Sequence, residues 1–228
     1  MQVKIAYQPS YALALVGLAA NESVIAESGA MVSMTSNIAI QTSGRAATGG
    51  GGILKALKRS MLGGESFFMN SFTAQGGPGE VTFAPTLPGD IISLPLAGPS
   101  IIIQRSSYLA SSPTVAIDTS WQGFKGFFGG ESMFMLKASG QGEVLVNSFG
   151  AIHEIPLAGP YIVDTGHIVA FDETLTFQVK KVGSWKATFF SGEGLVTVFN
   201  GRGRLWIQSR NPSAFGHTIG GKLPPRRG

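Results

Sequence analysis

Few residues in this sequence have side chains that could do chemistry. The 228 residues include three histidines (His153, His167 and His217), 13 acidic residues and no cysteine. Without cysteine the chain can form no disulfide, no thiolate metal site and no cysteine nucleophile. The histidines lack the His-x-His spacing that a metal-binding β-strand presents, so they do not predict a metal site. His167 and Asp164 are weak candidates for a functional site, and we expect His167 to end a strand and to bond to backbone.

Motifs for other common chemistries are absent as well. No Gly-x-Ser-x-Gly sequence is present, so a serine nucleophile on a strand-to-helix turn is not indicated. The four glycines at 49–52 lead into Ile53-Leu54-Lys55, which has no hydroxyl residue to hold magnesium as a phosphate-binding loop requires. We therefore expect no catalytic residue, no cofactor and no resident metal.

One pattern of residues recurs three times. It consists of two apolar residues, Gly or Ser, Gly, Glu, Ser or Gly, and two more apolar residues. Its central pairs are Gly64 and Glu65, Gly130 and Glu131, and Gly192 and Glu193. Because a basic residue precedes each copy, the structural interpretation is that each glutamate bonds backbone N–H groups in its own turn or pairs with that cation. The alternative is that the three carboxylates meet on an axis and bind a cation.

The residues around these signatures predict short β-strands. Stretches rich in β-formers are residues 30–34, 114–117 and 175–179. Asn200-Gly201 lies between two apolar runs and predicts a hairpin, since both residues accept positive φ, and Gly140–Gly142 marks a similar turn. A corner at Pro95–Pro99 recurs as Pro156–Pro160. The sequence therefore shows an internal repeat in both its strands and its turns.

These patterns predict an all-β protein of three tandem antiparallel units that pack around a pseudo-threefold axis. We place the units at about residues 1–98, 99–159 and 160–212, followed by a flexible basic tail over residues 213–228. Glycine occurs 32 times, about twice its usual share. We expect most of these glycines to supply the positive-φ and tight-turn positions of the repeated β unit, with Gly49–Gly52 and the tail as flexible exceptions.

Two segments bear on membrane contact. The longest apolar run, residues 11–20, is too short for a bilayer span, which needs about 20 residues. We interpret it as a first β-strand, with a signal-peptide core as the alternative. Within the loop Gly49–Leu62, residues 53–62 could form a small basic amphipathic helix that contacts a membrane or a partner. We favour the alternative that Met61-Leu62 belongs to the core, because the repeat equates this pair with Phe127-Phe128.

The charge of the chain gives little support for nucleic-acid binding. The formal charge is +4, but Lys222, Arg226 and Arg227 lie in the C-terminal tail, and the remainder carries only +1. Proteins that bind nucleic acid usually show a basic face on the folded body.

Five stretches carry a resemblance to a known family. They are Gly63–Phe68, Pro88–Ile92, Asp164–Phe171, Gly192–Val196 and Leu205–Asn211. In this order they resemble the altered-inheritance-of-mitochondria family, over roughly residues 5–211. The resemblance implies three tandem subunits similar to the tryptophan RNA-binding attenuation protein, a shortened double-stranded β-helix. It implies no catalytic activity, substrate or cofactor, and its link to inner-membrane organisation in mitochondria applies here only by analogy.

We expect a non-catalytic scaffold or interaction protein of the cytoplasm, not an enzyme, that self-associates into a homo-oligomer. A charged share of only 13% suits buried interfaces between copies. The family analogy adds a peripheral membrane contact linked to membrane organisation. Two alternatives remain: a single-stranded RNA-binding module, by fold analogy, and a small-molecule enzyme on a β-helix scaffold.

Overall fold

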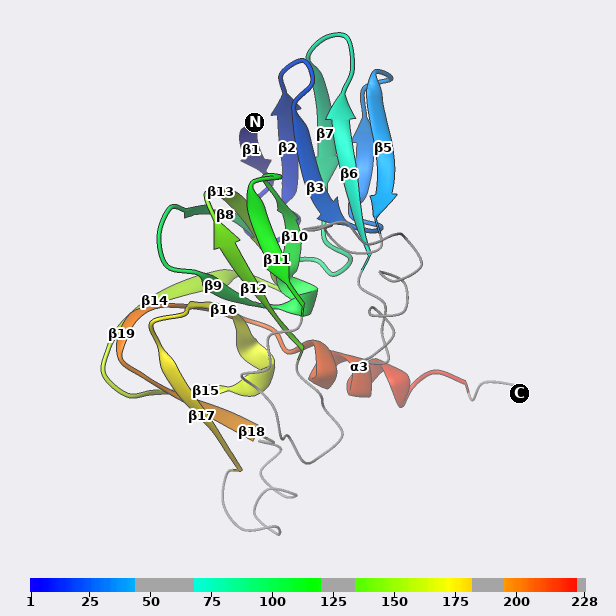
Figure 1. Ribbon diagram of the computed structural model, residues 1–228. Coiled ribbons are helices and arrows are strands. Elements are labelled where there is room, and N and C mark those ends of the chain that lie inside the picture. Colours follow the sequence, from blue (N-terminus) through cyan, green and yellow to red (C-terminus); the bar gives the residue numbers. More distant parts are fainter. Residues whose placement is uncertain (44–67, 120–133, 182–194, 225–228) are drawn as a thin grey trace.

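The computed structural model of the chain describes residues 1–43, 68–119, 134–181 and 195–224 (Figure 1). These residues form β-strands almost throughout, with two short 3₁₀ helices and one α-helix. All pairs of neighbouring strands are antiparallel. The predicted all-β fold class is confirmed, whereas the pseudo-threefold axis and the likeness to the attenuation protein stay predictions.

After β1 (Gln2–Ala6), the strands follow in three sets of six, which we call units. The first unit consists of β2 (Leu13–Leu18), β3 (Ser23–Glu27), β4 (Met31–Met34), β5 (Ile38–Ser43), β6 (Met69–Ala74) and β7 (Gly79–Phe83). The second unit consists of β8 (Ile91–Leu96), β9 (Ile101–Gln104), β10 (Tyr108–Ser111), β11 (Val115–Asp118), β12 (Met135–Gly140) and β13 (Gly142–Asn147). The third unit consists of β14 (Ile152–Ala158), β15 (Tyr161–Asp164), β16 (Ile168–Asp172), β17 (Thr176–Lys181), β18 (Leu195–Asn200) and β19 (Arg202–Gln208). The helices are η1 (Arg105–Ser107), η2 (Thr165–His167) and α3 (Pro212–Gly220).

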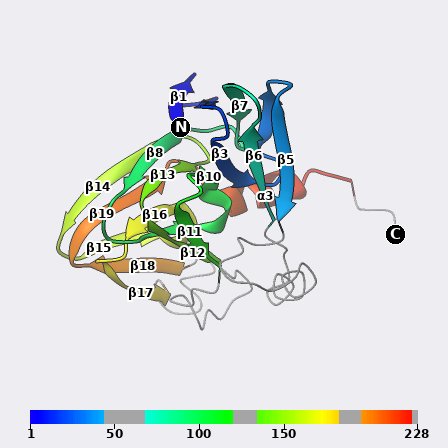
Figure 2. The same cartoon turned by 45° about the horizontal axis from the view of Figure 1, so that its top comes forward.

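The strands form four sheets that follow one another through the molecule (Figures 1 and 2). Sheet I has the order β1-β2-β7-β4 and sheet II the order β5-β6-β3-β10-β13-β8. Sheet III has the order β11-β12-β9-β16-β19-β14 and sheet IV the order β15-β18-β17. In both views sheets I and IV lie at opposite ends of the molecule.

Neighbouring units are joined because they share the two six-stranded sheets. In sheet II, β3 of the first unit pairs with β10 of the second, with Ala26 opposite Ala110. In sheet III, β9 of the second unit pairs with β16 of the third, with Ile103 opposite Ala170. We call these two pairings the joints. Each joint pairs the second strand of one unit with the third strand of the next.

The same corner is built at the end of the third strand of each unit (β4, β10 and β16). Thr35, Ser112 and Asp172 each accept a hydrogen bond, through a side-chain oxygen, from a backbone N–H at the start of the last strand, at 3.1, 3.0 and 2.8 Å. The donors are Glu80, Glu143 and Arg204. The residue before each donor is a glycine (Gly79, Gly142 and Gly203) whose Cβ, if present, would come within 2.8 Å of this corner. Only glycine lets the two segments approach so closely.

The hydrophobic core consists of three clusters, one between each pair of successive sheets. The first core includes Phe72 and Phe83, which meet edge to face at 5.3 Å. The second core surrounds the fully buried Trp206. The third core includes Phe171 and Phe199, whose ring centroids lie 5.0 Å apart. Burying each such ring contributes about 1.5–3 kcal/mol, so sheets II and III, with cores on both sides, hold the molecule together.

The predicted strands at residues 30–34, 114–117 and 175–179 correspond to β4, β11 and β17, and the apolar run at 11–20 contains β2. The predicted hairpins are wrong. Asn200-Gly201 joins β18 to β19, but β18 belongs to sheet IV and β19 to sheet III. Gly140 and Gly201, with φ of 110° and 118°, turn the chain from one sheet into the next. Local turn chemistry reverses the chain, whereas the partner of each strand depends on which apolar face it must cover.

The C-terminal segment begins with order where we expected a flexible tail. Asn211 caps α3 by accepting a hydrogen bond from the Ala214 N–H, and Pro212 occupies its first turn, as is typical of helix starts. The flexibility of the residues after α3 stays a prediction. The unit boundaries predicted at residues 98/99 and 159/160 also stay predictions, although the pairing of the strands groups β8 with the second unit and β14 with the third.

Candidate functional site

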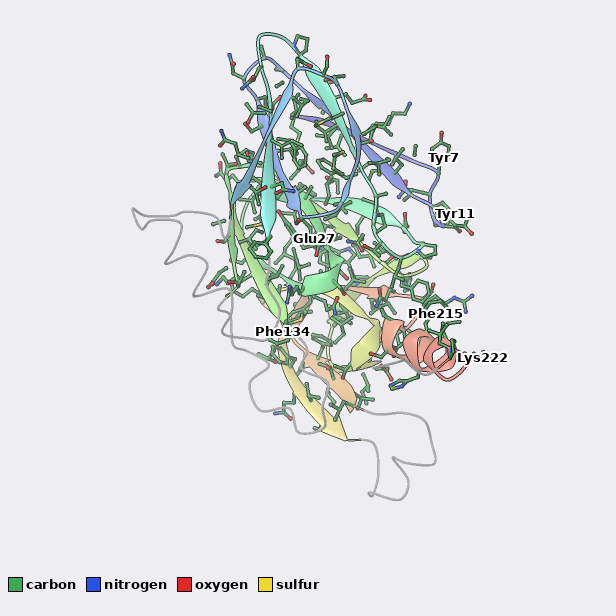
Figure 3. The ribbon with its side chains drawn as sticks, turned by 90° about the vertical axis from the view of Figure 1, so that its right-hand side faces the viewer. Tyr7, Tyr11, Glu27, Phe134, Phe215 and Lys222 are labelled. Carbon is green, nitrogen blue, oxygen red and sulfur yellow. The ribbon has the colours of Figure 1, made fainter. Side chains whose placement is uncertain are left out.

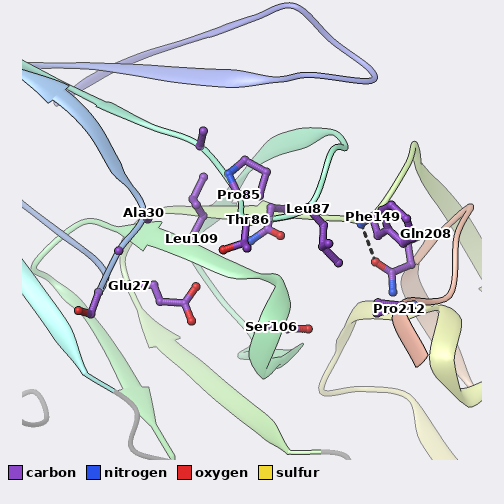
Figure 4. Close-up of a pocket in the computed structure, with 14 residues that line it drawn as sticks. Glu27, Ala30, Pro85, Thr86, Leu87, Ser106, Leu109, Phe149, Gln208 and Pro212 are labelled. Atoms are coloured by element: carbon purple, nitrogen blue, oxygen red, sulfur yellow. Dashed lines mark hydrogen bonds between the residues drawn. The ribbon is translucent and has the colours of Figure 1, made fainter. Parts of the chain in front are cut away.

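A cleft of about 300 Å³ lies where the three units meet (Figure 4). Its walls come from the end of β3 and the turn after it, the segment between β7 and β8, η1, β10, and the residues near the ends of β13 and β19. Leu87, Leu109 and Pro212 make much of the lining apolar. Glu27 contributes the only carboxyl group among the described lining residues.

Glu27 is held in an unusual electrostatic state. It is the last residue of β3, and burial raises the pKa of its carboxyl to about 7, although Arg105 nearby opposes this rise. The buried Tyr108 follows η1, and its hydroxyl lies 2.9 Å from the Ser111 hydroxyl. Burial also raises the pKa of Tyr108 far above its usual range. At neutral pH Glu27 is therefore partly protonated and the Tyr108 hydroxyl is fully protonated.

The weak candidates Asp164 and His167 lie at the end of β15 and in η2, the third unit's counterpart of η1. The Asp164 carboxylate accepts a hydrogen bond from the Gly166 N–H at 2.8 Å and so caps η2. The ring nitrogen Nδ1 of His167 lies 2.7 Å from the backbone carbonyl of Gln208. The Gln208 side chain donates to the Gly166 carbonyl and accepts from the Phe149 N–H (Figure 4). Both candidates therefore take part in the hydrogen bonds that fix the position of η2.

Helix α3 borders the cleft. Pro212 lines it, and Phe215 packs against Phe149 with ring centroids 5.1 Å apart. The Asn211 side chain lies so close to Gly166 that a Cβ there would come within 2.3 Å of it. The helix is thus attached to the third unit by its first turn, while its other residues face solvent.

The described lining of the cleft has one group that titrates near neutral pH. With a pKa near 7 the Glu27 carboxyl can take up and release a proton, and it would act as a general base only on a proton within hydrogen-bond reach. The described lining residues include no histidine and no second carboxyl. Across the described ranges, no three His, Asp or Glu side chains are grouped so that they could hold a metal ion.

Several sequence predictions lie outside the described residues. They are the signature residues Gly64, Glu65, Gly130, Glu131, Gly192 and Glu193, and the loop Gly49–Leu62. Both interpretations of the repeated glutamates therefore stay predictions. Of the helices that the structure describes, none has the length and apolar character needed to cross a bilayer.

Reasoning from sequence missed Glu27, Arg105 and Gln208. Each is an ordinary polar residue in or beside a strand, and its surroundings come from other units. One signal could have been found: Glu27, Gln104 and Asp164 end the same strand of successive units, so superposing the repeats marks a polar corner at that position.

Comparisons with known proteins give a consistent assignment. The family described as Mitochondrial biogenesis AIM24 matches residues 3–210. An uncharacterized protein of Streptococcus pyogenes serotype M6 is 32% identical over 207 residues, which are 89% of this chain and 83% of that protein. An X-ray crystal structure of a Streptococcus pyogenes protein is 28% identical and has a TM-score of 0.79. That similarity covers 97% of this chain and 99% of the crystallised one.

The family resemblance predicted from the sequence is confirmed, because the match extends over nearly the whole chain. Neither streptococcal relative has a name that states an activity. The chain therefore belongs to the Mitochondrial biogenesis AIM24 family.

Proposed function

We propose that this protein is a non-catalytic scaffold that acts by self-association. The polar residues most able to do chemistry are engaged in structural bonds. Asp172 receives the Nε and Nη2 hydrogens of Arg204, both at 3.1 Å, and Trp206 donates to Glu154 at 2.8 Å. These groups fasten β14, β16 and β19 to one another, so they are not available for reaction.

The observation that carries the proposal is the place of the exposed large apolar side chains. Met31, Val32 and Met34 are exposed on β4, and Tyr161 and Ile162 are exposed on β15. Both strands are edges of their sheets. An apolar edge strand has unpaired backbone groups beside an apolar surface, which is the usual basis for pairing with another chain.

The proposal is tested by the mass of the purified full-length chain in solution. Light scattering coupled to gel filtration, over a hundredfold range of protein concentration, is expected to show species larger than one chain. A mass equal to one chain at every concentration would contradict the proposal.

A second candidate function, contact with a membrane surface, has its own observation. Tyr7 and Tyr11 are exposed in the turn between β1 and β2, and Phe215 and Lys222 lie on the same side of the molecule (Figure 3). Exposed tyrosines and a basic residue beside apolar ones suit the boundary between headgroups and acyl chains. Such a contact would allow a scaffold to assemble on a membrane.

Co-sedimentation with lipid vesicles tests this second function. Vesicles with anionic headgroups are expected to retain more protein than neutral ones, and the double substitution of Tyr7 and Tyr11 by Ser is expected to lower that retention. Equal recovery of both proteins in the supernatant would exclude this surface as a membrane contact.

A further inference from the structure

The two joints within the chain pair corresponding strands of successive units. Among the described strands, this pattern leaves two counterparts without a partner in another unit. The second strand of a unit (β3, β9) pairs with the third strand of the next unit (β10, β16). Their counterparts at the ends are β15, the second strand of the last unit, and β4, the third strand of the first. Within the described ranges β15 pairs only with β18, and β4 only with β7.

The third strands (β4, β10 and β16) can be compared residue by residue, because each has the same shift of register against the last strand of its unit. This bulge falls between Met31 and Ser33, between Tyr108 and Ala110, and between Ile168 and Ala170. The residue in the bulge is Val32, Leu109 or Val169. Leu109 is 1% exposed in the first core and Val169 is 0% exposed in the second. Each thus fills the core of the preceding unit, whereas Val32, which no other unit precedes among the described residues, is 57% exposed.

The second strands (β3, β9 and β15) show the reciprocal pattern. Their pairing places Ile25, Ile102 and Ile162 at the same position. Ile25 packs against the second core and Ile102 lies within the third, so each contacts the core of the following unit. Ile162 has the same residue type, but no further unit follows it among the described residues, and 64% of its surface is exposed.

We propose that β15 of one copy pairs antiparallel with β4 of a second copy and repeats the internal joint between molecules. The register of the joints places Ser33 opposite Val163, Met34 opposite Ile162, and Thr35 opposite Tyr161. Val32 then enters the third core of the preceding copy and Ile162 contacts the first core of the following copy. The inference rests on the proposed self-association and names its interface.

The other sheet edges do not fit this role. Among the described strands, β5, β11 and β17 are edges in all three units. The first strands β8 and β14 are also edges, whereas β1 covers their counterpart β2. Several carry residues that discourage pairing: Pro95 in β8, Pro156 in β14, and Lys180 in β17. Neither β4 nor β15 contains a proline or a lysine.

A second copy, rather than the same chain, is the occupant. Sheets I and IV lie at opposite ends of the molecule in both ribbon views (Figures 1 and 2), so β4 and β15 of one chain are far apart. Each copy uses two different surfaces, which makes the contact heterologous. Such a contact repeats from copy to copy until it closes into a ring or continues as a filament.

The first experiment places a charge at each end of the full chain. Val32→Asp and Ile162→Asp are each expected to raise the dissociation constant of self-association at least about 100-fold, because a carboxylate must then be desolvated in the interface. Ile40→Asp, at an exposed apolar residue of the edge strand β5, is the matched control and is expected to leave it unchanged. Circular dichroism and melting temperature verify that each variant is folded.

Mixing the two variants tests the polarity of the contact. Val32→Asp retains an intact β15 and Ile162→Asp retains an intact β4, so the mixture is expected to give a dimer of one chain of each kind that cannot extend. Two separate monomers in the mixture would overturn the head-to-tail pairing. If wild type is a monomer, the proposed function fails with the inference. If wild type associates and both variants associate equally well, only the inference fails.

Cysteine cross-linking tests the register, and the absence of native cysteine keeps the result clean. A mixture of Met34→Cys and Ile162→Cys chains is expected to form an intermolecular disulfide on mild oxidation, since opposite residues of paired strands lie close together. A mixture of Ile40→Cys and Ile162→Cys is the control and is expected to remain reduced. In a chain carrying both Met34→Cys and Ile162→Cys, a disulfide confined to single chains would overturn the proposal, because the two ends would then meet within one molecule.

Discussion

We call the exposed edge strands β4 and β15 the open ends. At the joints and at the open ends, corresponding strands of the units lie in different surroundings. All four residues of β10 are buried at a joint, whereas all four residues of β4 are exposed at an end. Both strands have the same bulge and pair with the last strand of their own unit. The difference comes from the neighbouring unit, which β10 has and β4 lacks.

The exposed strand β4 also carries a more polar residue pair than its counterparts at the joints. At the joints, Ala110 lies opposite Leu145 and Ala170 lies opposite Trp206. The same pair at the open end is Ser33 and Thr82, whose hydroxyl oxygens lie 2.6 Å apart and satisfy each other. A surface of this kind tolerates solvent better than the joint does, which suits an association that can be reversed.

The largest difference is expected when the bulge residue is shortened. Leu109→Ala removes a buried side chain from the first core and is expected to lower the free energy of unfolding by about 2–5 kcal/mol. Val32→Ala, at the same position of the open end, is expected to change it by less than about 0.5 kcal/mol. Urea denaturation of both variants, made in the Ile162→Asp chain so that association does not contribute, measures the contrast. Equal losses would mean that β4 is not open.

Removing the side-chain acceptor at the repeated corner is expected to have the next largest effect. Asp172→Ala leaves the Arg204 backbone N–H without its acceptor and frees the guanidinium, so we expect a loss of about 1–3 kcal/mol. Thr35→Ala, at the corner beside the open end, removes one neutral hydrogen bond to the Glu80 N–H and is expected to cost about 0.5–1.5 kcal/mol.

Thermal unfolding of the two corner variants, with Ser112→Ala as the neutral counterpart at the other joint, measures this series. Much of the Arg204 side chain is exposed, so its ion pair adds little to the loss. A smaller loss for Asp172→Ala than for Ser112→Ala would show that the charge at this corner is not stabilising.

The contrast between joints and ends also explains what the sequence could predict. Periodic apolar residues and turn glycines are local features, and they were sufficient for the all-β fold and several strands. The pairing of β3 with β10 joins Ala26 to Ala110, far apart along the chain, and no local pattern specifies such a partner. The Asn200-Gly201 hairpin failed for the same reason, because β18 and β19 each find partners in a different sheet.

The candidate cleft could not be predicted from the sequence, for a related reason. Glu27 and Gln208 come from different units and line one cleft only after the units are joined. The burial that raises the pKa of Glu27 arises from that assembly and not from its neighbours in sequence. By contrast, the prediction that His167 bonds to backbone agrees with its contact to the Gln208 carbonyl, although His167 lies in η2 and not at the end of a strand.

The pH dependence of stability is expected to depend on the joint through Glu27. Its pKa is about 7 in the folded protein and 4.5 as the ordinary value, so the folded state holds the proton more tightly. The stability that this group contributes is therefore complete below pH 4.5 and is lost as the pH rises to 7. Because Glu27 is only partly buried, solvent screening reduces this effect, and we expect a loss of about 1–2 kcal/mol.

Glu27→Gln tests this assignment, because the amide has the same shape and does not titrate. The variant is expected to lack the decline between pH 4.5 and 7 and to be more stable than wild type above pH 7. Urea denaturation of both proteins at a series of pH values gives the comparison. A parallel decline in the variant would mean that another group is responsible.

The smallest expected effect belongs to an ion pair that crosses the second joint. Lys137 on β12 lies 2.5 Å from Glu173, the residue that follows β16, and its hydrogen bond lowers the pKa of that carboxyl. The same positions at the open ends are Val198 on β18 and Ser36 after β4, which cannot form an ion pair. Lys137→Ala is expected to cost about 0.5 kcal/mol or less in dilute buffer, and less still in 1 M salt, because exposed pairs are screened. A salt-independent loss of more than about 1 kcal/mol would show that the lysine stem packs across the joint, and burial rather than charge would then distinguish this joint from the ends.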